Sequence, residues 1–270
     1  MPGKEEGARA GLRRFGRSRA AKKEALEAER EQARSLQLQW LPRETPQLDG
    51  FRIACAWRPS DEVSGDYFDV FAVEGERLAL CIADVSGKGA AAAALMGELH
   101  EAVRKFAPEA ESPADLCAQV NQALCRPGSQ TRYATMFYGN LDRPGRLRYE
   151  SAGHCLPLLL RGDGGVEFPA SFSGVIGLFS HWLYQNQEVE LGPGDCLLLI
   201  TDGILLAENR RQEEFGYQRL IAAAKKGRDG GADAVGDEVL SAVTEFCGGR
   251  LQDEASLIVV CREELSQTPA

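Results

Sequence analysis

The sequence of 270 residues lacks several patterns that define common protein classes. Its eight cysteines include no CxxC pair, which argues against a zinc ribbon. No apolar run approaches the roughly 18 residues needed to cross a bilayer, and no apolar core of a signal peptide follows the N-terminal charges. We therefore expect a cytoplasmic protein without a membrane span or a disulfide scaffold. Cysteines inside apolar runs, namely Cys81, Cys196 and Cys261, should act as small buried hydrophobes.

Positive charge is scarce outside the N-terminus. Residues 1–24 hold eight Lys and Arg against three Glu, a balance of 8 − 3 = +5, whereas the remainder of the chain carries 23 − 37 = −14. An acidic body disfavours nucleic acid as a partner of the domain itself. A basic arm can touch nucleic acid, anionic lipid or an acidic protein, but the simpler interpretation of residues 1–19 is a disordered, solubilising arm.

Residues 20–42 have the composition of a helix that precedes the main domain. Pro42 ends it, because a proline disfavours helical geometry in the residue before it. Apolar side chains recur on one face at spacings of seven, three and four: Leu26, Ala33, Leu36 and Trp40. Two interpretations stay open: the stripe packs on its own domain, or a second copy or an upstream activator binds it.

Residues 43–264 show short apolar runs separated by Gly and Pro turns, and a tail of residues 265–270 follows. Strands are predicted at 51–57, 69–75, 77–83, 135–141, 155–161, 196–202 and 255–261. Helices are predicted at 90–106, 113–125 and 217–246. Because the strands come in neighbouring groups and do not alternate with helices, we predict an α+β domain of packed sheets.

A glycine-rich turn, DVSGKG at residues 84–89, follows one of the apolar runs. A P-loop needs G-x-x-x-x-G-K-[ST], and here too few residues precede the lysine and no Ser or Thr follows it. A dinucleotide-binding G-x-G-x-x-G also fails, because five alanines follow the second glycine. The turn therefore does not predict a nucleotide-binding loop, and its aspartate becomes the informative residue.

Four aspartates stand at strand ends next to glycine-rich segments: Asp66, Asp84, Asp202 and Asp253. One such residue alone is usually a solvated turn residue. Two packed sheets, however, can bring several strand ends together at one edge, and glycines permit close backbone approach there. Carboxylates without neighbouring His or Cys ligands suit Mg²⁺ or Mn²⁺ better than Zn²⁺.

Five motifs in order resemble those of the metal-dependent protein serine/threonine phosphatases, and most closely their SpoIIE-type branch. They are SGDYFD at 64–69, DVSGKG at 84–89, SAGH at 151–154, TDG at 201–203 and DEASL at 253–257. The match covers residues 36–262. It implies a four-layer αββα sandwich of two antiparallel sheets, with two Mn²⁺ or Mg²⁺ ions at one edge. The implied ligands are Asp66, Asp84, the carbonyl of Val85, Asp202 and Asp253.

The resemblance also implies an activity: hydrolysis of phosphoserine or phosphothreonine on an anti-sigma factor antagonist, by a water that bridges the two ions. Such a reaction needs no side-chain nucleophile. Three departures from the branch stand out: Ser64 for glycine, Leu206 for glutamate, and Glu254-Ala255-Ser256 for Asp-x-Thr. They leave open a second interpretation, a non-catalytic interaction protein of the same fold that binds such a partner.

Other residues of the motifs receive lesser expectations. Lys88, at the start of an alanine-rich helix, is a candidate contact for a substrate phosphate. His154 is expected to be a turn histidine bonded to the backbone, and not a catalytic group. Tyr67 and Phe68 are expected to fill the space between the sheets.

Overall fold

The computed structural model describes residues 27–28, 31–35, 37–60, 65–126, 132–170 and 173–263. The arm of residues 1–19, the tail of residues 265–270, and Leu26, Leu36 and Ser64 lie outside the described residues.

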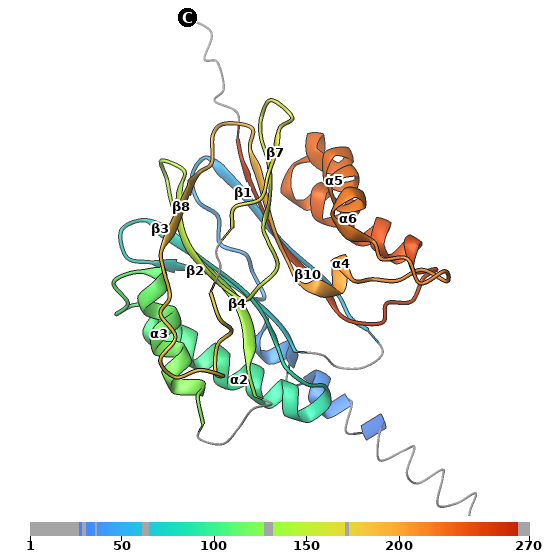
Figure 1. Ribbon diagram of the computed structural model, residues 1–270. Coiled ribbons are helices and arrows are strands. Elements are labelled where there is room, and N and C mark those ends of the chain that lie inside the picture. Colours follow the sequence, from blue (N-terminus) through green and yellow to red (C-terminus); the bar gives the residue numbers. More distant parts are fainter. Residues whose placement is uncertain are drawn as a thin grey trace, which may run out of the picture.

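The described chain forms two antiparallel sheets packed face to face (Figure 1). The first sheet has the strand order β1 (Phe51–Arg58), β10 (Ala255–Arg262), β9 (Cys196–Ile200), β6 (Leu158–Leu160) and β7 (Val166–Glu167). The second has the order β2 (Asp66–Val73), β3 (Arg77–Val85), β4 (Ala134–Asp142), β5 (Arg146–Ala152) and β8 (Gln187–Glu190). The prediction of an α+β sandwich is confirmed.

Helices cover the outer face of each sheet and complete four layers (Figure 1). The second sheet carries α2 (Gly89–Phe106) and α3 (Pro113–Leu124), and the first carries α5 (Gly216–Gly227) and α6 (Gly231–Phe246). A single helical stretch was predicted over 217–246. The chain instead breaks at the short η1 (Arg228–Gly230), where Gly231 has a φ of 79° that a continuous helix does not allow.

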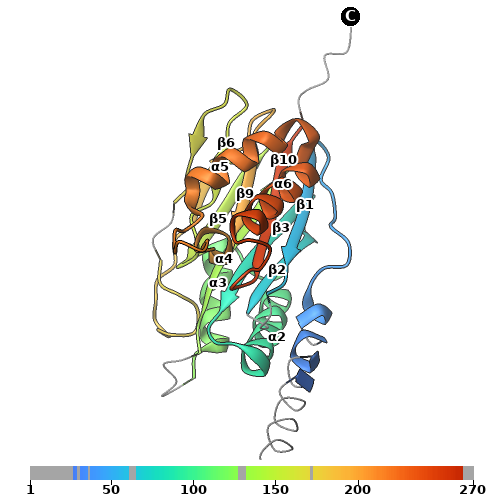
Figure 2. The same ribbon diagram turned by 90° about the vertical axis from the view of Figure 1, so that its right-hand side faces the viewer.

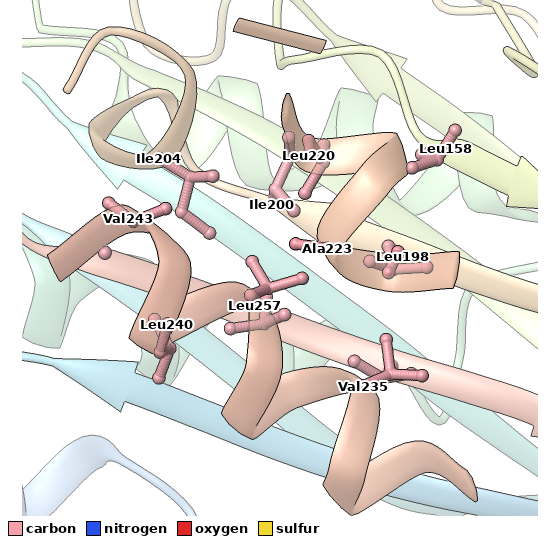
Figure 3. Close-up of a cluster of buried hydrophobic side chains, with 14 of the residues drawn as sticks. Leu158, Leu198, Ile200, Ile204, Leu220, Ala223, Val235, Leu240, Val243 and Leu257 are labelled. Carbon is pink, nitrogen blue, oxygen red and sulfur yellow. The ribbon is translucent and has the colours of Figure 1, made fainter. Parts of the chain in front are cut away.

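Central strands are buried on both faces, so their side chains serve two cores in alternation. Leu197 and Leu199 of β9 pack between the sheets, whereas Leu198 points to α5 and α6. Figure 3 shows the outer core, in which Leu198 and Leu257 of the first sheet meet Leu220 and Val235 of the helices. This alternation explains why the strands appear in the sequence as continuous apolar runs.

The same alternation corrects one expectation. Phe68 lies in the core between the sheets, as predicted, but Tyr67 points to the opposite face and is fully buried beneath α2. Its hydroxyl donates to Asp69 at 3.0 Å, and its ring meets His100 edge-on. Adjacent strand residues cannot fill the same layer, and this was the error in the prediction.

The helix before the domain packs on the domain. Residues 31–35 and 37–40 are helical, and they run beside α2 (Figure 2). Ala33 is fully buried against Ala93 of α2, and the ring of Trp40 lies 4.9 Å from that of His100. The described part of the predicted stripe therefore contacts its own domain. Leu38, on the other side, is 48% exposed.

Two cysteines depart from the expectation of isolated hydrophobes. Cys196 of β9 and Cys261 of β10 are directly opposite each other in the first sheet, and a disulfide joins them. The side chains of opposed residues in antiparallel strands meet on one face, a register that composition does not reveal. Cys81 is a free, fully buried thiol, as expected.

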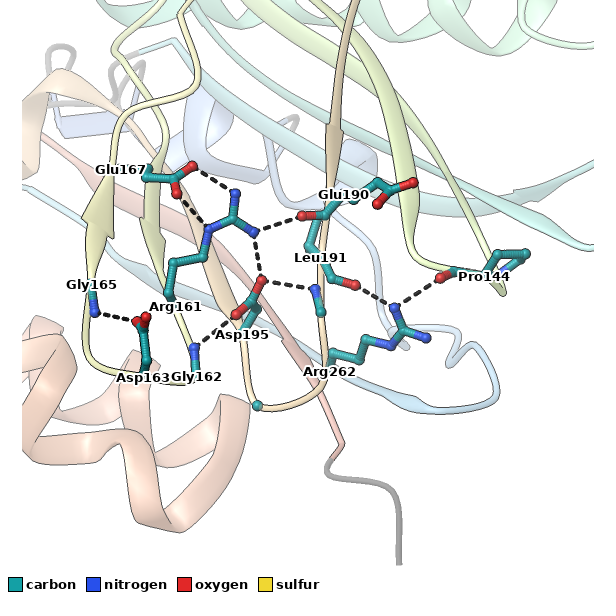
Figure 4. A network of polar contacts seen from close by, with 12 residues as sticks. Pro144, Arg161, Gly162, Asp163, Gly165, Glu167, Glu190, Leu191, Asp195 and Arg262 are labelled. Carbon is teal, nitrogen blue, oxygen red and sulfur yellow. Dashed lines mark hydrogen bonds and ion pairs between the residues drawn. The ribbon is translucent and has the colours of Figure 1, made fainter.

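At the end of the sandwich where β9 begins, a polar network surrounds a depression of about 800 Å³ (Figure 4). Arg161 donates to both oxygens of Glu167 and to Asp195, which also accepts from the backbone of Gly162. These charges satisfy one another and tie the β6–β7 hairpin to the turn before β9. We therefore assign the network a structural role.

No helix in the described ranges is both long and apolar enough to cross a membrane.

The core between the sheets makes a testable prediction. Leu80 is fully buried there, so Leu80→Ala should lower the free energy of unfolding by about 2–5 kcal/mol through lost burial and a residual cavity. Urea unfolding of both proteins measures the loss. Leu38→Ala, at an exposed leucine, should change stability by less than about 0.5 kcal/mol. Equal effects of the two substitutions would contradict the assignment of Leu80 to the core.

Candidate metal site

The four predicted acids come to one edge of the sandwich. Asp66 begins β2 and Asp84 lies near the end of β3, directly opposite it in the sheet. Asp202 begins the short helix α4 (Asp202–Leu205) after β9, and Asp253 precedes β10. Each sheet thus contributes two carboxylates. Asp253 precedes the start of β10, whereas Arg262 of the network in Figure 4 lies at the other end of that strand.

Burial and mutual repulsion raise the pKa values of three of the acids. Burial, then the charges of Asp202, Asp253 and Glu254, raise the pKa of Asp84 from 3.8 to about 7, although Lys88 lowers it. Burial, and then Asp84, raise the pKa of Asp66 well above its ordinary value. The pKa of Asp202 is also raised, by burial and by Asp253. Buried like charges of this kind are unfavourable unless a cation accompanies them.

Two glycines let the backbones approach at this edge. A Cβ on Gly203 would lie 1.8 Å from the carbonyl oxygen of Glu254. A Cβ on Gly65 would lie 2.5 Å from the carbonyl oxygen of Val85, the backbone oxygen that the resemblance implies as a ligand. A side chain at either position would push the acid-bearing segments apart, which explains the glycines in GD and TDG.

Asp66 has partners that the sequence interpretation missed. One of its oxygens, Oδ2, accepts hydrogen bonds from Thr201 Oγ1 at 2.7 Å and from Ser256 Oγ at 2.6 Å. All three residues are buried, at 2%, 0% and 0% exposure. Thr201 belongs to the TDG motif and Ser256 to the DEASL motif. Membership of these motifs was the signal in the sequence that could have identified them as partners of Asp66.

A second missed contact joins the N-terminal helix to the site. Gln37 is fully buried, and its Nε2 donates to Glu254 Oε2 at 2.5 Å and lies 3.5 Å from the carbonyl oxygen of Asp66. Glu254, itself 1% exposed, is the neighbour of Asp253. The longer glutamate side chain at this position therefore contacts a segment more than 200 residues away in the sequence.

A cavity of about 250 Å³ opens beside the acids. Lys88, Asp202 and Asp253 line it together with Leu206, which is 52% exposed. Lys88 thus lines the same cavity as two of the acids, and its contact with a substrate phosphate stays a prediction. Leu206 presents an apolar surface at the place where the resemblance implies a glutamate.

His154 is fixed by tertiary contacts and stays outside the proposed ligand set. Its Nδ1 lies 2.8 Å from Thr135 Oγ1. Burial lowers its pKa to about 4, so the ring is neutral at pH 7. Its hydrogen bond is made with the side chain of a residue on β4 and not with nearby backbone, so the prediction of a backbone-bonded turn histidine is wrong.

The donor set suits a divalent cation. In the described part of the chain, no three His, Cys, Asp or Glu side chains already converge closely enough to enclose an ion. The chemistry of the side chains nevertheless fits a cation. Burial and neighbouring acids raise the pKa of Asp66, Asp84 and Asp202, and Lys88 offsets part of the charge at Asp84. Oxygen donors of this kind favour Mg²⁺ or Mn²⁺.

Comparisons with known proteins identify relatives of this chain and of its fold. Residues 74–263 match the family of Stage II sporulation protein E (SpoIIE). Protein IcfG of Synechocystis sp. is 28% identical over 222 residues, covering 72% of this chain and 35% of that protein. Phosphoserine phosphatase RsbU of Bacillus subtilis is 26% identical over 243 residues, covering 88% of this chain and 71% of that protein.

Solved structures agree. The RsbU and RsbW domains of a Mycobacterium tuberculosis protein superpose with a TM-score of 0.69 at 26% identity, covering 84% of this chain and 64% of that one. The catalytic domain of the phosphatase PstP, solved with two manganese ions, superposes with a TM-score of 0.56 at 18% identity, covering 79% and 99%. The chain thus spans about a third of IcfG and about seven tenths of RsbU.

The acid cluster predicts an unusual pH dependence of stability. Because the pKa of Asp84 is about 7 in the folded protein and 3.8 ordinarily, the folded state binds this proton more tightly than the unfolded state. Stability is therefore lost as pH rises through this range in metal-free protein. Asp84→Asn removes the titration, so its melting temperature in excess chelator should exceed that of wild type by more at pH 8 than at pH 5. A difference that is constant with pH would contradict the raised pKa.

Proposed function

The chain belongs to the SpoIIE family, and we propose that it is a metal-dependent protein phosphatase that hydrolyses phosphoserine or phosphothreonine on a regulatory protein, an anti-sigma factor antagonist. The observation that carries the proposal is the gathering of Asp66, Asp84, Asp202 and Asp253 at one edge. Burial and the neighbouring acids raise the pKa of the first three. The name of RsbU, a phosphoserine phosphatase, supports the substrate class.

In this proposal the four aspartates and the Val85 carbonyl hold two Mn²⁺ or Mg²⁺ ions. When bound, the ions supply an activated water and positive charge for the phosphoryl oxygens. The protein's own residues position this chemistry: Thr201 and Ser256 orient Asp66, and Gly65 and Gly203 permit the close approach of the acids. These carboxylates come from both sheets, so the sandwich itself sets their spacing.

Lys88 is the proposed contact for the substrate phosphate. It lines the cavity beside Asp202 and Asp253 and immediately precedes α2, whose N-terminus favours anions. Leu206 lines the same cavity and offers the phosphoprotein an apolar contact next to the phosphate.

We further propose that the N-terminal helix regulates the site, through an activator or a second copy that binds the helix. Gln37 supports this proposal because it is fully buried between the Asp66 backbone and the Glu254 side chain. Movement of the helix would break a polar contact to segments that carry two of the acids. Metal–ligand distances tolerate little displacement, so a small shift would change metal affinity.

The exposed Leu206, at a position where the resemblance implies glutamate, favours one alternative: a non-catalytic protein that binds the same partner. The four carboxylates favour catalysis. Turnover of a small aryl phosphate separates the two.

Asp202→Asn tests the metal-dependent reaction. Wild type should hydrolyse p-nitrophenyl phosphate with Mn²⁺, lose this activity in excess EDTA and recover it with Mn²⁺, because oxygen-only sites exchange their ions. Asp202→Asn should lower kcat about a hundredfold or more, since it removes one proposed ligand. Asp163→Asn, at the opposite end of the sandwich, is the matched control and should leave kcat unchanged. Full wild-type activity after prolonged chelation, or an Asp202→Asn variant within about threefold of wild type, would refute the mechanism.

Gln37→Ala tests control by the helix. Loss of its contacts with Glu254 and Asp66 should weaken Mn²⁺ activation about tenfold, the usual effect of removing an outer partner of a metal ligand. Gln39→Ala, at an exposed glutamine of the same helix, is the control. The Mn²⁺ concentration for half-maximal activity measures the effect, with melting temperatures recorded on the same preparations. Identical Mn²⁺ dependence in Gln37→Ala and wild type would reduce the helix to a passive linker.

A further inference from the structure

A buried hydroxyl pair crosses between the two sheets at the acid edge. Asp66 belongs to the second sheet, whereas Ser256 lies on β10 of the first sheet and Thr201 directly follows β9. Both hydroxyls donate to the same carboxylate oxygen, Asp66 Oδ2, at 2.7 and 2.6 Å. The Ser256 backbone N–H in turn donates to Thr201 Oγ1 at 3.1 Å. Thr201, Ser256 and Asp66 thus form a closed ring of hydrogen bonds, here named the hydroxyl clamp.

The clamp restricts the orientation of the Asp66 carboxylate. With Oδ2 engaged by two short hydrogen bonds, rotation of the carboxylate would leave buried donors without partners, which is costly. The other oxygen, Oδ1, is therefore the one directed to a further partner. Asp66 is held to a single orientation.

The hydroxyl of Thr201 bonds to the clamp residues and does not cap the helix that follows it. Thr201 is the N-cap residue of α4, where a threonine side chain normally accepts a hydrogen bond from the backbone of the next turn. Here the side chain makes no capping bond. Its Oγ1 instead accepts from the Ser256 backbone and donates to Asp66.

The clamp also connects three of the four acids. Thr201 is bonded through the chain to Asp202, and Ser256 lies three residues after Asp253, so both first-sheet acids flank clamp residues. The apolar side chains between the sheets set a spacing but no direction, because hydrophobic contact is not directional. A directed polar bond is needed to hold carboxylates of different sheets in one relative position.

We propose that Thr201 and Ser256 are positioning residues that fix Asp66 against the first sheet, so that it presents one oxygen to a divalent cation shared with Asp202 and Asp253. This inference rests on the proposed function, because it assigns the clamp to the same metal site. Divalent cations such as Mg²⁺ demand near-ideal geometry, so loss of the clamp acts first on metal affinity and only secondarily on the fold.

The experiment compares deletion of each hydroxyl with its conservative replacement. Ser256→Ala and Thr201→Val remove one donor each, whereas Ser256→Thr and Thr201→Ser keep it. Ser151→Ala is the control, because Ser151 is equally buried at 1% exposure and its hydroxyl has no hydrogen-bond partner among the described residues. Mn²⁺ binding is measured without substrate, from the electron paramagnetic resonance signal of free Mn²⁺, and thermal unfolding is followed in EDTA.

Both deletions should raise the Mn²⁺ dissociation constant about tenfold or more, the range seen when an outer partner of a ligand is removed. The conservative variants and Ser151→Ala should stay within about threefold of wild type, because they keep the clamp donors. A purely structural role would lower the melting temperature and leave Mn²⁺ affinity unchanged.

The outcomes separate this inference from the proposed function. If wild type binds Mn²⁺ and both deletion variants bind it equally well, the clamp is overturned and the proposed function stands. If wild type binds no Mn²⁺, both are overturned. Should Ser256→Ala fail to fold, the comparison of Thr201→Val with Thr201→Ser decides alone: equal Mn²⁺ affinity of these two overturns the clamp.

Discussion

The structure depends on the cost of placing several carboxylates together in a partly buried space. Asp84 faces three other acids, and its pKa of about 7 shows that the fold opposes their simultaneous ionisation. No apolar packing compensates for such repulsion, and Lys88 offsets only part of it. The proposed cations would relieve this repulsion, so metal binding and the stability of this edge would be coupled.

The rest of the sandwich provides the rigidity that this edge requires. Strands that are buried on both faces, such as β9 and β10, pack against the second sheet on one side and against α5 and α6 on the other. β9 ends and β10 begins at the same edge, which places Asp202 and Asp253 there. Gly203 permits a backbone approach that any Cβ would prevent, and the hydroxyls of Thr201 and Ser256 fix Asp66 across the gap between the sheets.

The N-terminal helix brings this edge into contact with a segment outside the sandwich. The ring of Trp40 contacts the ring of His100 on α2. The side-chain amide of Gln37 lies between the Asp66 carbonyl and the Glu254 carboxylate, so this side of the helix contacts the segments that carry the acids. The large polar depression around Arg161 lies at the other end, where its charges are already paired. The proposed metal site and the proposed regulatory contact of the helix therefore lie at a single edge.

The sequence by itself indicated seven of the ten described strands, and its motifs pointed to the two-sheet fold and the four aspartates, because an apolar run, a glycine or an acid at a strand end is a local signal. It missed β5, β7 and β8, which are less continuously apolar or very short. It did not determine which face a residue occupies or what it meets across the molecule. Tyr67 was assigned to the wrong core, Cys196 and Cys261 were not recognised as opposed residues, and Gln37 was not noticed. The partners of Asp66 in the clamp lie 135 and 190 residues away, and Gln37 lies 217 residues from Glu254. Only the register of paired strands and the packing of one sheet on the other bring such positions within hydrogen-bond distance, and these depend on the whole chain.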